Sequence, residues 1–196
     1  MKYIFPPRPE TAINPSQLSY YEKRGWIGQI KKNGTCVVIN IDNGVEVWNR
    51  HEQKLKYDMP EGMNKLLRDI PDRTILVGEL LHFKTKHLKN TLYLFDILVH
   101  ADDSLTGMLL NDRLAILESL LPATNGIGPG YLNYGWGVWM SRPIKDFDKT
   151  FKSLSSDEDE GLVLKNPTGK LKDGDKPNSN SLWQVKCRRP TKNYGW

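Results

Sequence analysis

One short stretch, residues 29–35 (QIKKNGT), places two lysine amines immediately before a turn signal. The runs on either side of it, residues 26–30 and 36–41, are apolar and β-branched, as strands are. Asn-Gly between two such runs predicts a tight hairpin turn that holds Lys31 at the mouth of a sheet. An amine held there is a candidate nucleophile. Asn-Gly turns beside lysines are also common on solvated hairpins, so the stretch alone leaves both interpretations open.

Two mostly apolar runs, residues 74–82 and 92–99, each contain a single carboxylate, Glu79 and Asp96 respectively. Apolar runs of this length are typical of neighbouring buried strands. A buried carboxylate requires a cation, a metal ion or hydrogen-bond donors, because an unpaired one is costly. Glu79 and Asp96 therefore pair either with structural arginines and backbone amides, or with lysines and a ligand in a functional site.

The chain of 196 residues carries a formal net charge of +5 and has a sequence pI near 9.1. The basic excess favours a polyanionic partner such as nucleic acid, although a generic basic surface accounts for it equally well. The two cysteines, Cys36 and Cys187, lack metal-ligand spacing, which argues against zinc and disulfides and suits a reducing compartment. No stretch is apolar over a length that spans a bilayer, so we expect a cytoplasmic protein with no membrane partner.

The remaining pattern predicts a single α+β domain over residues 1–196. An extended proline-rich arm at residues 6–9 precedes a short helix at 15–21, and the turn signals within residues 26–50 predict a three-stranded antiparallel meander. Further strands are expected at 74–82, 92–99, 138–140, 160–165 and 182–188, further helices at 60–70, 110–121 and from Pro143, and loops at 122–137 and 166–181. In the helix at 110–121 the leucines form the buried stripe, with Arg113 outside it.

Five short motifs follow one another between residues 29 and 188: Lys31-x-Asn33-Gly34, Gly78-Glu79, Phe95-Asp96, Glu160-Gly161 and Lys186-x-Arg188. In this order they resemble the motifs of the covalent nucleotidyltransferases, which include ATP-dependent DNA ligases, RNA ligases and mRNA capping enzymes. The helix at 110–121 and the run at 160–165 favour ligases over capping enzymes. The resemblance implies a nucleotidyltransferase (ATP-grasp-like) fold of antiparallel β-sheets flanked by helices.

The resemblance also implies a set of site residues. Lys31 would be the nucleophile that takes AMP from ATP, with Lys186 and Glu79 as the other catalytic residues. The cofactor-binding residues it implies are Gln29 at the adenine edge, Arg50 at the ribose or nick phosphate, Glu79 at the ribose, Phe95 stacked on the purine, Lys186 and Arg188 at the α-phosphate, and Ile30 and Lys165 at the nucleotide. Glu160 is implied to hold Mg²⁺ or Mn²⁺.

The chemistry of such a site places a demand on its charges. A lysine side chain with its ordinary pKa of about 10.4 is protonated at pH 7, so the site must favour the neutral amine. Lys186, Arg188 and a divalent cation near Lys31 would do so, because like charges disfavour an ammonium, and carboxylates then cannot dominate the immediate field. The resemblance implies AMP transfer to a 5′-phosphate end followed by attack of a 3′-hydroxyl. The expected partners are therefore nicked duplex DNA or RNA ends, acted on by a monomer.

Several features depart from the family pattern. Asn33 stands in place of the usual aspartate, Cys36 in place of an arginine, and Arg188 in place of a second lysine. Too few residues follow Arg188 for a C-terminal OB domain within this chain. The leading hypothesis is an ATP-dependent DNA ligase catalytic domain. An RNA ligase, a GTP-using capping-type guanylyltransferase and a catalytically inactive nucleic-acid-binding module remain as alternatives.

Overall fold

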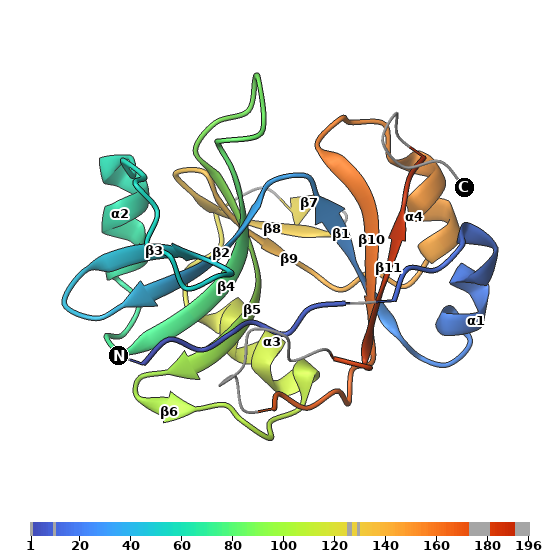
Figure 1. The fold of residues 1–196 in the computed structure, drawn as a ribbon, viewed down its shortest axis with the longest axis horizontal. Helices are drawn as coiled ribbons and strands as arrows, with labels where there is room; N and C mark the ends of the chain where they lie inside the picture. Colours follow the sequence, from blue (N-terminus) through green and yellow to red (C-terminus); the bar gives the residue numbers. More distant parts are fainter. Residues whose placement is uncertain (1, 10, 125–126, 129, 173–180, 191–196) are drawn as a thin grey trace.

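The computed structural model of the protein describes residues 2–9, 11–124, 127–128, 130–172 and 181–190. It contains two β-sheets with short helices around them, which confirms the expected α+β class (Figure 1). The helices are η1 (Pro15–Gln17), α1 (Leu18–Glu22), α2 (Glu61–Arg68), α3 (Leu110–Ser119) and α4 (Phe147–Ser153). The strands are β1 (Ile27–Lys32), β2 (Thr35–Ile41), β3 (Val45–Asn49), β4 (Thr74–Leu81), β5 (Thr91–His100), β6 (Asp103–Ser104), β7 (Ile127–Gly128), β8 (Tyr131–Gly135), β9 (Val138–Ser141), β10 (Asp159–Lys165) and β11 (Gln184–Arg188).

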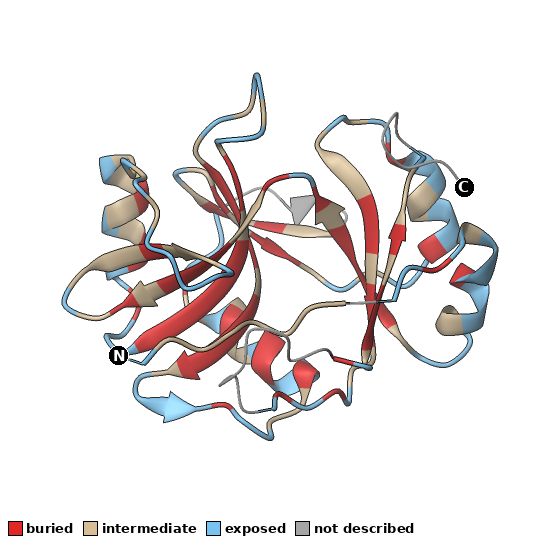
Figure 2. Ribbon diagram, viewed as in Figure 1, coloured by how far each residue is buried: buried red, intermediate tan, exposed pale blue. Residues whose placement is uncertain are grey.

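The larger sheet has the strand order β3-β2-β4-β5-β9-β8-β7, with β6 paired to β5. All its pairs are antiparallel except β5 with β9, which is parallel. Strands β4 and β5 lie at its centre and are apolar on both faces, as expected of strands covered from both sides. Figure 2 shows the buried residues concentrated in these central strands, while the helices expose their outer faces. Leu110, Leu114 and Leu117 of α3 belong to this core.

The smaller sheet has the order β1-β10-β11, and α1 and α4 pack beside it around a second apolar cluster that includes Leu18, Phe147 and Leu164. This arrangement corrects the expected hairpin and meander. β1 pairs with β10, whereas β2 pairs with β3 and β4, so the Asn-Gly turn crosses from one sheet to the other. The Asn-Gly signal correctly marks a break between two strands, but the predicted hairpin is wrong, because strand partners are set by long-range packing that a turn dipeptide does not specify.

Other expectations needed smaller corrections. The segment 122–137 was expected to be a loop, but its described residues include β7 and β8. The fourth helix begins at Phe147 rather than at Pro143, because Ile144 exchanges backbone hydrogen bonds with Gly28 of β1 at 2.8 and 2.9 Å. The last strand begins at Gln184, since Leu182 is exposed. In the expected loop at 166–181, residues 173–180 lie outside the described part. Among the described residues, no helix is long and apolar enough to cross a membrane.

Candidate active site

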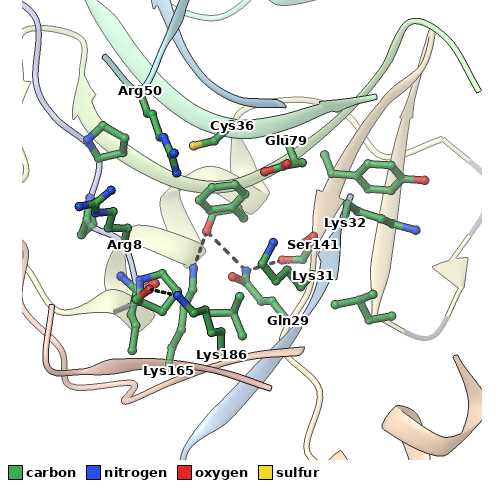
Figure 3. A pocket seen from close by; sticks show the side chains of 18 of the residues that line it. Arg8, Gln29, Lys31, Lys32, Cys36, Arg50, Glu79, Ser141, Lys165 and Lys186 are labelled. Carbon is green, nitrogen blue, oxygen red and sulfur yellow. Dashed lines mark hydrogen bonds between the residues drawn. The ribbon is translucent and has the colours of Figure 1, made fainter. Parts of the chain in front are cut away.

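A cavity of about 460 Å³ lies where the two sheets meet. Its lining comes from β1 and β10–β11 of the small sheet, from β2, β4 and β5 of the large sheet, and from the N-terminal arm (Figure 3). Cavities of this volume accommodate nucleotide-sized ligands. The convergence of separate strands on one cavity explains why the chemistry-bearing residues are spread so widely along the sequence.

Lys31 reaches this cavity from β1 and forms an ion pair with Glu160 of β10. The register places Gly161 opposite both Lys31 and Arg188, while Lys32 pairs with Asp159, so Glu160 is the extra residue of a β-bulge. Such bulges re-aim a side chain out of the regular alternation. Here the bulged carboxylate contacts Lys31 and also Arg188 Nε, the latter at 2.6 Å. Carboxylates were expected not to dominate the immediate field of Lys31, yet in this structure the direct ion-pair partner of Lys31 is the Glu160 carboxylate.

The Asn-Gly crossover links Lys31 to Glu79. The Gly34 amide donates a hydrogen bond to Glu79 Oε1 at 3.0 Å, and a Cβ at Gly34 would lie 2.7 Å from the Leu80 carbonyl oxygen. Only glycine allows this close approach of the crossover to β4. Burial raises the pKa of Glu79, while the Lys31 charge and the Gly34 amide act in the opposite direction.

Gln29 lies deeper in the cavity, and its amide orientation follows from its neighbours. Its Nε2 donates to the Ser141 carbonyl at 2.8 Å and faces the Phe95 carbonyl at 3.5 Å. Because carbonyl oxygens only accept, the amide nitrogen must point toward them. The buried Gln29 Oε1 consequently has no hydrogen-bond partner within the described protein. This oxygen can therefore accept a hydrogen bond from a ligand. The Ser141 contact uses a backbone carbonyl, which carries no sequence signal.

Lys165 lies beside Gln29, with its side chain 2% exposed. Its ammonium lies 4.9 Å from the Phe95 ring centroid and faces the Phe95 carbonyl at 3.5 Å. Burial lowers the pKa of Lys165 to about 8, partly opposed by the negative charge of Asp96. Phe95 thus presents its aromatic ring to the cavity, with the buried Lys165 amine beside that ring.

The structure gives different surroundings to Asp96 and Glu79, the two carboxylates for which the sequence left the same alternatives open. Asp96 turns away from the cavity and forms a bidentate ion pair with Arg113 of α3, at 2.9 and 3.0 Å. Arg113 also donates to the Met108 carbonyl at 2.8 Å and is fully buried, with 0% of its surface exposed. The expectation that Arg113 lies outside the buried stripe is therefore wrong. Asp96 is structural, whereas Glu79 lines the cavity.

Four further basic residues line the cavity: Arg8, Arg50, Lys186 and Arg188. Burial lowers the pKa of Lys186, and the nearby charges of Arg188, Lys31 and Arg8 lower it further. Arg8 and the neighbouring prolines belong to the N-terminal arm, which sequence reasoning did not place at the site. Three prolines beside one arginine predict an extended arm, but they do not say where it docks.

Comparison with known proteins bears on this geometry. Residues 82–186, which make up more than half of the chain, match the family described as "ATP dependent DNA ligase domain". The chain belongs to this family. No curated protein matches the chain at a significant level.

The solved structures that share this fold include DNA ligases. The mycobacterial DNA ligase D complexed with ATP and MES has a TM-score of 0.61 at 17% identity over 84% of this chain and 54% of its own. The ligase domain of M. tuberculosis LigD has a TM-score of 0.61 at 18% identity over 83% of this chain and 53% of its own. A Lig E DNA ligase has 0.54 at 16% identity over 84% and 62%. The present chain thus spans roughly half to three fifths of these structures, and at such identity the likeness concerns the fold.

In this DNA ligase domain, the residues expected at the site come together. Nine of them line the cavity: Gln29, Ile30, Lys31, Arg50, Glu79, Phe95, Lys165, Lys186 and Arg188. The tenth, Glu160, contacts two of these nine. Their individual chemical roles stay predictions. Among the described residues, no group of three or more histidine, cysteine or acidic side chains is arranged to hold a metal ion by itself.

Proposed function

We propose that residues 1–196 form one nucleotidyltransferase domain that attaches AMP from ATP to Lys31 and passes it to a 5′-phosphate end of DNA. The observation that carries this proposal is the position of the Lys31 amine in a nucleotide-sized cavity, in contact with Glu160 and near the cations Lys186 and Arg188 of β11. Attack by the neutral amine on the α-phosphorus forms the phosphoramide bond and releases pyrophosphate. Lys186 and Arg188 lie where they would stabilise the negative charge that develops on the phosphate oxygens.

The deep end of the cavity supports adenine as the base. Gln29 Oε1 needs a donor, and the exocyclic amine of adenine supplies one. Guanine carries a carbonyl oxygen at the corresponding position, which would face Gln29 Oε1 acceptor to acceptor. Phe95 offers a ring on which a purine stacks. The similar mycobacterial ligase was solved with ATP bound, which accords with this choice over GTP.

The residues present are compatible with a Mg²⁺ ion. This ion usually takes only one or two protein carboxylates and completes its octahedron with phosphate oxygens and waters, so the lack of a larger acidic cluster among the described residues does not count against it. Glu160 is the carboxylate nearest to Lys31 and Arg188 and would supply the protein ligand. When bound, Mg²⁺ would neutralise charge on the phosphates and on the leaving pyrophosphate.

The later steps are proposed from the family and the charge. Membership of the DNA ligase family and the net charge of +5 support a DNA end carrying a 5′-phosphate, with a 3′-hydroxyl completing the nick. Arg50 lies on the exposed rim of the cavity, where it would meet the end of the strand. RNA ends remain a test case, because contacts to phosphates distinguish the two polymers poorly.

The test is intact-protein mass after incubation with Mg²⁺ and either ATP or GTP. We expect the wild-type chain, first freed of any bound AMP, to gain one AMP moiety with ATP and no GMP with GTP. Lys31→Arg should abolish the gain, because a guanidinium is a poor nucleophile. Lys152→Arg is the matched control and should retain it, since Lys152 is exposed, pairs with Asp148 on α4 and does not line the cavity.

Two results would contradict the proposal. A GMP adduct would indicate a capping-type transferase, and an AMP adduct that persists in Lys31→Arg would place the nucleophile elsewhere. If no adduct forms, sealing of a pre-adenylylated nick would separate a protein that lacks only the first step from one that merely binds nucleic acid. Nicked DNA and nicked RNA should be compared as substrates in the same assay.

A further inference from the structure

The N-terminal arm, here residues 2–9 and 11–13, connects the two sheets across the cavity (Figure 1). At one end the Tyr3 hydroxyl donates to the Asn49 carbonyl of β3 at 2.8 Å. At the other end Ile13 N donates to the Lys186 carbonyl at 2.9 Å, and Lys186 N donates to the Thr11 carbonyl at 3.0 Å. The arm is therefore fixed on both sides of the cavity and forms part of its wall.

Arg8 lies in the middle of this arm and is held at a defined place. Prolines at positions 6, 7 and 9 restrict the backbone around it, because each fixes its own φ and limits the preceding residue. The Arg8 carbonyl accepts from Ser181 Oγ at 3.2 Å and from Ser181 N at 3.4 Å. The backbone that carries Arg8 therefore needs little further ordering when a ligand binds.

The Arg8 side chain lines the cavity together with Lys186 and Arg50, as Figure 3 shows. Its charge is close enough to Lys186 to lower the pKa of that lysine. The arm also contacts Lys186 directly, since Lys186 Nζ donates to the Pro9 carbonyl at 3.3 Å. Arg8 and Lys186 thus belong to one cationic wall, built from opposite ends of the sequence.

We propose that Arg8 is a phosphate-binding residue of this site, which the N-terminal arm holds over the cavity. This inference rests on the proposed function, because that function places phosphates beside Lys186. A planar guanidinium matches two phosphate oxygens at once, and the nearby Lys186 adds a second positive charge for the same anion. Two groups have that chemistry, the β- and γ-phosphates of ATP and the 5′-phosphate of the DNA end.

The variants Arg8→Ala and Arg8→Lys test the assignment, with Arg24→Ala as the control of equal charge change. Arg24 does not line the cavity, and its guanidinium lies 3.6 Å from the Tyr20 ring centroid. Thermal unfolding checks that each variant is folded. The first measurement is the rate of Lys31-AMP formation against ATP concentration in a single turnover. The second is the sealing rate of a pre-adenylylated nick against nick concentration, which bypasses ATP.

We expect Arg8→Ala to raise one half-saturating concentration by about 10-fold to 100-fold, while the maximum rate changes less. Arg8→Lys should reverse part of this rise, because it keeps the positive charge but lacks the planar guanidinium that contacts two oxygens at once. A rise for ATP alone identifies the β- and γ-phosphates, and a rise for the nick alone identifies the 5′-phosphate. A purely structural role would lower the unfolding temperature and the maximum rate without this split.

The assignment is overturned if both half-saturating concentrations in folded Arg8→Ala stay within twofold of those of Arg24→Ala. Equilibrium binding of ATP to the Lys31→Ala protein, with and without Arg8→Ala, separates this failure from failure of the proposed function. If this ATP binding depends on Arg8 but the wild-type chain never forms a lysine-AMP adduct, the phosphate site is supported and the lysine chemistry is refuted. Binding of neither ATP nor a nick refutes both.

Discussion

The Asp96–Arg113 ion pair makes a prediction about stability that is independent of the chemistry in the cavity. Both side chains are almost fully buried, and two N–H groups of Arg113 meet the two carboxylate oxygens of Asp96 at 2.9 and 3.0 Å. Asp96 also accepts from the Ile97 amide at 2.9 Å, and Arg113 donates to the Met108 carbonyl. The substitution Arg113→Met removes the cation while keeping an unbranched apolar side chain of similar reach.

The expected loss follows from what remains behind. Without Arg113, the Asp96 carboxylate is buried with a single backbone donor, and breaking a buried pair in this way costs about 3–5 kcal/mol. Asp96→Asn leaves the opposite charge unpaired and should cost a similar amount. The double variant Asp96→Asn/Arg113→Met buries no charge, so its loss should fall at least about 2 kcal/mol short of the sum of the two single losses. A domain's whole stability is about 5–15 kcal/mol, so each single change is severe.

Urea unfolding followed by fluorescence measures these free energies, provided the slope with urea stays constant across the series. Arg73→Met is the control, because it breaks the exposed Arg73–Asp102 pair at 2.7 Å and should cost no more than about 1 kcal/mol. If Arg113→Met costs no more than Arg73→Met, or if the cycle is additive, the structural account of Asp96 is refuted. Folded variants should still form Lys31-AMP, since the pair does not reach the cavity.

Two further predictions concern the cavity itself. The pKa of Lys165 is about 8 in the folded chain and 10.5 as its ordinary value, so between these pH values the unfolded chain binds the Lys165 proton more tightly. The free energy of unfolding of the wild type should therefore rise across this pH range, by up to about 3 kcal/mol relative to that of Lys165→Met. Urea unfolding of both proteins across this range checks it, and parallel curves would contradict the assignment. Gly34→Ala should slow Lys31-AMP formation at least about tenfold and cost about 1–3 kcal/mol of stability, because its Cβ would lie 2.7 Å from the Leu80 carbonyl. Single-turnover adenylylation at the wild-type rate would show that the crossover tolerates a side chain.

Much of the fold was predictable because its elements have clear local signals. The apolar runs of β4 and β5, the leucine stripe of α3 and the proline that precedes α2 each determine an element from within its own sequence. The pairing of β1 was not predictable in this way. Asn33 N donates to the Glu158 carbonyl at 2.7 Å and Gly34 N donates to Glu79, so the turn bonds to distant strands rather than closing a hairpin.

Site residues were predictable where a side chain in a motif carries the chemistry. They were missed where a backbone group makes the contact, or where a distant segment docks at the cavity. Lys31, Glu79 and Lys186 stand in recognisable motifs and line the cavity. Ser141 acts through its carbonyl, and Arg8 arrives on an arm whose docking depends on β3 and β11. Arg113 lies three residues after Leu110 and four before Leu117, so the helical period places it at the edge of the buried stripe. Its charge was the reason to expect exposure, and the buried Asp96 carboxylate on β5 compensates that charge.

Glu160 changes how the charge of Lys31 should be understood. The family resemblance suggested a lysine kept neutral by surrounding cations, yet the bulge in β10 places the Glu160 carboxylate against both Lys31 and Arg188. An ammonium paired with a carboxylate is not a nucleophile. In the proposed reaction the phosphates of ATP are anions that compete with Glu160 for the same two cations. Binding of ATP would therefore exchange one anionic partner for another at Arg188, freeing Glu160 for a metal ion. With the Glu160 carboxylate withdrawn, the Lys31 amine would no longer be held in its ion pair and would face the α-phosphate of the bound ATP.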